Sequence, residues 1–200
     1  MIKFNIFNKV EKLYINRSLI INVVALIFIS PLLINAIFKG YKMSDLEIVL
    51  GILSCVLIFI GLITKFYGQF NYEKLKGKIE GFIELHDDKI IVNEKVYEIE
   101  KIKKIEIYNG DYKGKWKSKI RSNYSNALSN GVDNVIRIIM ENEKESIGIY
   151  FLQNEKYELK KAEKQLIKYY QSGKIHLLKL LDILNITDYD EIQKFKNTIR

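Results

Sequence analysis

Two long apolar stretches near the N-terminus dominate the hydrophobic pattern of the chain. They run from Leu19 to Phe38 and from Ile48 to Ile63, and neither contains a charged side chain. Each is close to the roughly 20 residues that a helix needs to cross a hydrocarbon core at about 1.5 Å per residue. A cleaved secretory signal explains the pattern poorly, because no small-x-small site ends the first stretch and a second follows at once. We expect a hairpin of two transmembrane helices over residues 18–67.

Basic residues flank this hairpin on the outer side of both helices. They are Lys3, Lys9, Lys12 and Arg17 before the first stretch, and Lys65, Lys74, Lys76 and Lys78 after the second. Such residues tend to stay in the cytosol. The connection from Lys39 to Glu47 carries two bases and two acids and opposes this bias little. The pattern predicts a cytosolic N-terminal leader over residues 1–17 and both termini in the cytosol of a bacterial inner membrane.

After the hairpin the pattern changes to short alternating runs that are typical of β-strands. Tight turns join most of them, which favours an antiparallel sheet over residues 72–153, curled into a small barrel or sandwich. The predicted strands are Lys78–Leu85, Ile90–Val92, Val96–Ile99, Ile102–Tyr108, Val132–Met140 and Ser146–Leu152. The expected fold class is therefore a membrane hairpin followed by an α+β cytosolic part.

Residues 154–200 have helical periodicity. Asn154 is expected to cap a first helix that ends at Gly173, a second runs from Ile175 to Leu184, and a third follows an Asp188 cap. The sequence leaves open whether these helices pack on the β domain or on another subunit.

Composition limits the chemistry of the chain. Its 200 residues include 32 bases and 24 acids, and the net charge of +8 favours anionic partners such as lipid headgroups or nucleotides. The only cysteine, Cys55, lies inside the second apolar stretch, and His86 and His176 are far apart, so we expect no metal and no cofactor. The acidic pairs Asp87–Asp88 and Asp188 with Asp190 lie in turn or cap contexts. We expect a protein that is not an enzyme.

The segment between Tyr108 and Gly131 is much longer than a hairpin turn requires, and loops of this length are usually functional or disordered. It interleaves cations with aromatic rings, a mixture that suits a phosphate-bearing ligand because cations neutralise phosphates and rings stack on bases. The candidate residues for anion or nucleotide binding are Tyr112, Lys113, Lys115, Trp116, Lys117, Lys119, Arg121 and Tyr124. A lysine-rich loop lying against anionic lipid is the alternative.

Small side chains in the second apolar stretch predict a helix contact. Gly51, Ser54 and Cys55 fall on one side at i, i+3 and i+4, where they would let another helix approach closely. The partner is either the first helix of the hairpin or a second copy of the protein.

The order of two membrane helices, a short external turn and a cytosolic β domain resembles the two-transmembrane β-barrel effectors of bacterial cyclic-nucleotide (CBASS-type) antiphage defence. The resemblance covers Leu19–Phe38, Ile48–Ile63 and the strands from Lys78 to Leu152. It implies a barrel that senses a cyclic di- or oligonucleotide and a hairpin that assembles into homo-oligomers and disrupts the inner membrane. No nucleic acid polymer is implied as a partner. The β domain with its C-terminal helix also looks like bacterial pleckstrin-homology-like domains, which implies an adaptor for anionic lipid or protein.

Overall fold

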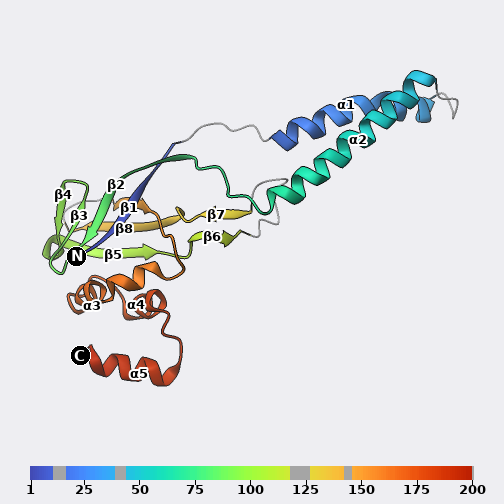
Figure 1. Ribbon diagram of the computed structural model, residues 1–200. Helices are drawn as coiled ribbons and strands as arrows, with labels where there is room; N and C mark the ends of the chain where they lie inside the picture. The colour runs from blue at the N-terminus through green and yellow to red at the C-terminus, as the bar shows by residue number, and fades with distance from the viewer. Residues whose placement is uncertain (11–16, 39–43, 118–126, 142–145, 200) are drawn as a thin grey trace. The chain divides into compact units, whose positions relative to one another are not determined.

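The computed structural model describes residues 1–10, 17–38, 44–117, 127–141 and 146–199. The chain is an α+β protein (Figure 1). It divides into two compact units, each of which is described here by itself. The first contains Met1–Glu11, Leu75–Lys115 and Ser129–Arg200, and the second contains Lys12–Lys74 and Trp116–Leu128.

The first unit is built on a seven-stranded antiparallel sheet in the order β4-β3-β2-β1-β9-β8-β5. Its strands are β1 (Ile2–Lys9), β2 (Gly77–Leu85), β3 (Lys89–Val92), β4 (Lys95–Glu98), β5 (Ile102–Tyr108), β8 (Asn134–Met140) and β9 (Ser146–Phe151). The six strands that the alternation predicted after the hairpin are thus confirmed. In the described residues β4 and β5 are the two edges, so the sheet is open, and closure into a barrel is not shown.

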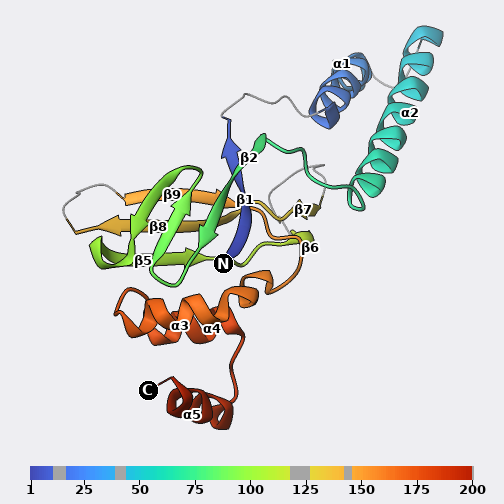
Figure 2. The ribbon, with the colours of Figure 1, turned by 60° about the vertical axis from the view of Figure 1, so that its left-hand side comes forward.

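The sheet has two halves that meet where β1 and β9 pair. This pairing is short, with Ile6 opposite Phe151 and the Leu152 N–H donating to the Asn5 carbonyl at 2.9 Å. Figure 2 shows the strands of the two halves running in clearly different directions. The sheet therefore curves around its apolar core.

Strand β1 comes from the segment that the charge pattern assigned to a cytosolic leader. It is the central strand of the sheet, with β2 on one side and β9 on the other. Phe4, Ile6 and Phe7 are buried, and the Phe4 ring packs edge-on against Phe151 with centroids 5.5 Å apart. Strand β1 therefore contributes Phe4, Ile6 and Phe7 to the buried apolar side chains.

The apolar helices are inserted between β1 and its antiparallel neighbour β2. Lys9 lies opposite Gly77, and the Val10 N–H donates to the Lys76 carbonyl at 2.9 Å. The chain thus leaves the sheet at one point and returns to it at the adjacent position.

The C-terminal helices pack on the sheet and share one apolar core with it, which answers the question that the sequence left open. They are the 3₁₀ turn Glu158–Ala162, α3 (Glu163–Gln171), α4 (Leu177–Leu184) and α5 (Tyr189–Thr198). The buried Tyr169 hydroxyl donates to the His86 carbonyl at 2.6 Å. Asp188 caps α5 as predicted, by accepting from the N–H groups of Asp190 and Glu191. Asn154 caps no helix; its N–H donates to the Glu158 carboxylate instead.

The second unit contains the two apolar helices, α1 (Arg17–Phe38) and α2 (Asp45–Gly68), packed against each other. Ser44 and Glu47 form a capping box at the start of α2, a Ser-x-x-Glu signal that is readable in the sequence. Of the described helices, α2 is long and apolar enough to cross a membrane, and only 11% of its apolar window is buried. The apolar part of α1 is shorter, from Ile20 to Asn35.

Candidate functional site

The described residues of the long segment between Tyr108 and Gly131 contain a two-stranded ribbon, which the sequence did not predict. Its strands are β6 (Lys113–Trp116) and β7 (Leu128–Asn130). The base of the ribbon belongs to the first unit, and the described residues of its tip, Trp116, Lys117, Ala127 and Leu128, belong to the second. Three predicted ligand-binding residues, Lys119, Arg121 and Tyr124, lie outside the described residues.

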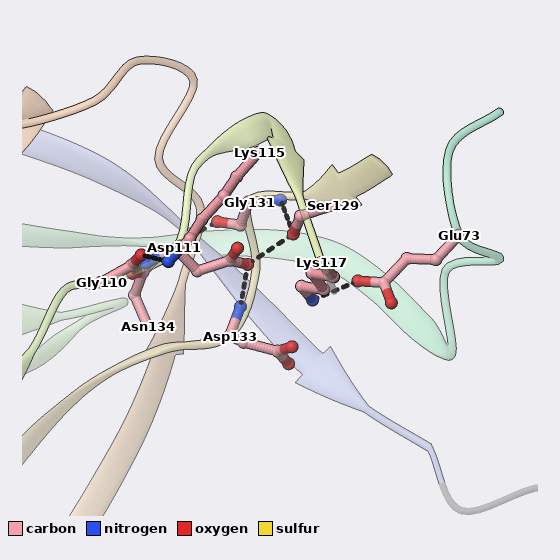
Figure 3. A network of polar contacts seen from close by, with 9 residues as sticks. All are labelled: Glu73, Gly110, Asp111, Lys115, Lys117, Ser129, Gly131, Asp133 and Asn134. Carbon is pink, nitrogen blue, oxygen red and sulfur yellow. Dashed lines mark hydrogen bonds and ion pairs between the residues drawn. The ribbon is translucent and has the colours of Figure 1, made fainter. Parts of the chain in front are cut away.

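A buried polar cluster holds the base of the ribbon (Figure 3). Asp111 is buried, and its Oδ2 accepts from the Ser129 hydroxyl at 2.6 Å and from the Asp133 N–H at 3.0 Å. The Asp111 N–H donates to Asn134 Oδ1 at 2.9 Å. Asn134 Nδ2 in turn donates to the Gly131 carbonyl at 2.9 Å. These bonds join the residues that precede β6 to both β7 and the start of β8.

Gln153, just after β9, extends this cluster. Its buried side chain donates through Nε2 to the carbonyls of Asn109 and Asp111, at 3.0 and 2.8 Å, and lies 3.0 Å from Asn134 Oδ1. Its backbone bonds both sides of the ribbon, because the Lys113 N–H donates to the Gln153 carbonyl and the Gln153 N–H donates to the Gly131 carbonyl. Buried polar networks with good partners rigidify a structure, so this one holds the base of the ribbon in the first unit.

The polar groups of the cluster hold the fold together and are not arranged for catalysis. A serine nucleophile must be reachable by substrate, with a base free to take its proton. Ser129 is fully buried, and its oxygen donates to Asp111 and accepts from the Gly131 N–H at 2.9 Å. In the described residues no group of three or more His, Cys, Asp or Glu side chains could hold a metal ion. Neither Asp111 nor Asn134 was singled out by sequence reasoning, because their partners lie some 20 residues away along the chain and no local spacing marks them.

The tip of the ribbon makes its own contacts within the second unit. Lys117 Nζ lies 2.5 Å from Glu73 Oε1, and both side chains are partly buried. The Glu73 N–H donates to the Leu128 carbonyl at 2.7 Å, and the Leu128 N–H donates to the Asn71 carbonyl at 3.2 Å. These contacts attach the tip to the segment that follows α2, and the Glu73 carboxylate compensates the Lys117 charge.

The remaining predicted ligand-binding residues differ in exposure and in their contacts. Tyr112 is half-buried, Lys113 is exposed, and the Lys115 ammonium donates to the Gly110 carbonyl. Trp116 is 50% exposed. A groove of about 660 Å³ lies elsewhere in the first unit, and none of the predicted residues lines it; it is lined by Tyr170, Gln171, Leu177, Lys196 and Ile199.

The three residues of the predicted helix contact differ in how deeply they are buried. Ser54 is fully buried, Gly51 is half-buried and Cys55 is exposed. Gly61, seven residues after Ser54, is buried as well, and a Cβ there would lie 3.8 Å from Asn22 Oδ1 on α1. Ser54 and Gly61 therefore lie on nearly the same side of α2, because a spacing of seven residues is close to two helical turns.

The acidic turn between β2 and β3 serves to dock α3. Asp87 accepts from Lys168 at 2.5 Å and from Gln165 at 2.9 Å, and these hydrogen bonds lower the pKa of its carboxyl. Hydrogen bonds from Lys3 and then His86 likewise lower the pKa of Glu84. Burial raises the pKa of the Tyr169 hydroxyl well above its ordinary value. These interactions explain Asp87 and His86 as parts of the packing between sheet and helix.

No protein-family model, curated protein or solved structure matches this chain.

Proposed function

We propose that this chain is an integral membrane protein with two spans, α1 and α2, and that its α+β unit is a binding module held at the cytosolic surface. The observation that carries the proposal is the insertion of both helices between the paired strands β1 and β2. The module acts by binding and not by catalysis, as an adaptor for anionic lipid or a protein partner.

The pairing of β1 with β2 restricts the number of membrane crossings. Val10 and Lys76, which begin and end the insert, are hydrogen-bonded to each other and lie on the same side of any membrane. If α2 crosses the bilayer, the chain must cross once more to return, because an odd number of crossings would separate the two residues. Between Val10 and Lys76, α1 is the other long apolar helix that the structure describes.

The exposed surface of α1 supports this second crossing. Its 22 residues would extend over about 33 Å at 1.5 Å per residue, similar to the thickness of a hydrocarbon core. Leu26, Ile27, Leu33 and Ile37 are exposed, and apolar surface of this extent is costly in water. A removable signal sequence does not fit, because its loss would take away β1, the central strand of the sheet.

The test uses membrane fractionation and cysteine labelling of the full chain. The protein should stay in the membrane pellet after an alkaline wash. In a Cys55→Ser background, a Tyr41→Cys variant should react with a membrane-impermeant maleimide on intact cells. A Tyr189→Cys variant is the matched control and should react only after permeabilisation, because Tyr189 lies exposed on α5 of the soluble unit. Release by the wash, or equal labelling of both variants in intact cells, would refute the proposal.

A second candidate function is the nucleotide-sensing effector, and one observation favours it. The segment that carries the predicted anion site runs from the first unit into the second between Lys115 and Trp116. A ligand that changes this segment would act on the membrane helices directly through the chain. Ligand binding must then favour the assembled form of the hairpin over the dispersed form.

Calorimetry of the full chain in lipid nanodiscs with cyclic di- and trinucleotides tests this candidate. Lys115→Ala and Trp116→Ala should abolish binding, whereas Lys160→Ala, which removes an exposed lysine of the same protein, should not. Gly51→Ile should block toxicity in cells while ligand binding persists. If none of the cyclic nucleotides produces a heat of binding, the effector candidate is refuted and the adaptor function is retained.

A further inference from the structure

Aromatic side chains gather where α2 ends. Phe66 and Tyr67 belong to its last turn, and Phe70 and Tyr72 follow within four residues of Gly68. All four are exposed, and the Phe66 and Phe70 rings meet edge-on with centroids 5.6 Å apart. In water such a set of exposed rings is unfavourable, but aromatic side chains are favoured at the boundary between lipid and water.

The length of α2 places these rings at such a boundary. Leu46 to Phe66 is a rise of 20 residues, which at 1.5 Å per residue is about 30 Å, the thickness of a typical hydrocarbon core. The start of α2 carries the polar capping box of Ser44 and Glu47. With that end at one interface, the turn from Phe66 reaches the other.

The tip of the β6–β7 ribbon is bonded to the residues that directly follow α2, near these aromatic rings. Asn71 and Glu73, which bond the tip, follow α2 by only a few residues. The 2.5 Å ion pair between Glu73 and Lys117 adds a side-chain clamp (Figure 3). Lys117 follows Trp116 directly, so the only tryptophan of the chain lies half-exposed one residue from this clamp.

We propose that the ribbon tip is an interfacial anchor, in which Trp116 rests among lipid headgroups beside the aromatic residues that end α2. Its partner is the phospholipid bilayer itself. The indole ring suits this place because its apolar face contacts acyl chains while its N–H bonds to headgroup or water. The Glu73–Lys117 pair holds the tip at this depth. This inference rests on the proposed crossing of the membrane by α2.

The experiment uses the fluorescence of Trp116 in the full chain reconstituted into phosphatidylcholine vesicles. Emission should be shifted to the blue. Lipids brominated near the headgroup should quench it more strongly than lipids brominated near the acyl-chain ends, and aqueous acrylamide should quench it weakly. The control is the double variant Trp116→Phe, Tyr189→Trp, which moves the single tryptophan to exposed α5 and should show the opposite behaviour. Glu73→Gln should make Trp116 more accessible to acrylamide.

Two outcomes would overturn the inference. In the first, Trp116 behaves like the tryptophan at position 189, open to acrylamide and untouched by either brominated lipid. In the second, deeply brominated lipid quenches best, which would place the ring in the acyl core. An alkaline wash of the same vesicles separates this from a failure of the membrane proposal. Protein that stays with the vesicles while Trp116 is in water refutes the anchor alone, and protein that is washed off refutes the spanning helices.

Discussion

Gly131 offers the sharpest test of how the base of the ribbon is held. Its φ is +76°, in the left-handed region. A Cβ at this position would lie 2.1 Å from the Gln153 carbonyl oxygen and 2.5 Å from the Lys113 nitrogen. Both are backbone atoms, so no side-chain rotation relieves the overlap. Gly131→Ala must therefore displace β6 from Gln153.

The cost can be worked out from the contacts that the displacement breaks. The left-handed conformation costs an alanine about 1–2 kcal/mol. Two backbone hydrogen bonds cross this point, from Lys113 to Gln153 at 2.9 Å and from Gln153 to Gly131 at 2.8 Å. Each contributes about 1 kcal/mol net. Gly131→Ala should therefore lower the free energy of unfolding by roughly 3–4 kcal/mol, which is large for a single methyl group.

Two other glycines distinguish the cost of the left-handed backbone from the cost of the Cβ overlap. Gly173 has φ +73° but open space around its would-be Cβ, so Gly173→Ala should cost only about 1–2 kcal/mol. Gly110 has open space and no positive φ, so Gly110→Ala should be neutral or stabilising by up to about 1 kcal/mol. The difference in unfolding free energy between Gly131→Ala and Gly173→Ala isolates the effect of the backbone overlap at Gly131.

Urea unfolding of the full chain in mild detergent, followed by circular dichroism, measures these changes. Limited proteolysis with peptide mapping should show that Gly131→Ala opens the segments on both sides of β7 first. Equal losses for Gly131→Ala and Gly173→Ala would refute the reasoning, because the overlap would then contribute nothing.

Three further predictions follow from the packing and the charges. Phe4→Ala should cost about 3–5 kcal/mol of unfolding free energy in the same urea assay, because the ring is in the core; a change near zero would mean that residues 2–9 are a leader after all. Gly61→Ala should be tolerated, since its Cβ would make only ordinary contacts at 3.8 Å, whereas Gly61→Leu should separate α1 from α2 and lower the thermal midpoint; indifference to leucine would contradict the helix contact. The pKa of Asp87 is lowered by hydrogen bonds to Lys168 and Gln165, so its stabilising effect is present above the ordinary value of 3.8 and is lost as the pH falls below it. Asp87→Asn should therefore make acid unfolding less steep in that range, and an unchanged acid profile would show that the α3 docking contact contributes no pH dependence.

Local patterns in the sequence were enough to predict most of the elements. Alternation marked the six strands after the hairpin, and the Asp188 cap and Gly173 marked helix ends, because hydrogen bonds between near neighbours decide such features. The apolar stretches likewise gave α1 and α2, since nothing but uninterrupted hydrophobicity is needed to recognise them. The central strand was missed although Ile2, Phe4 and Ile6 alternate with polar residues, because the basic residues beside an apolar helix were interpreted as a membrane-flanking leader.

The tertiary structure decided what depends on partners far apart in the chain. It placed β1 beside β2, so that the whole apolar insert begins and ends at neighbouring positions of the sheet. It also joined Asp111 to Ser129 and Asn134, and Glu73 to Lys117, over separations of 18 to 44 residues. No local spacing encodes such pairs, because they form only when the sheet has brought their strands together. The sequence by itself therefore determined the elements and the apolar surface, and the fold determined which polar groups meet.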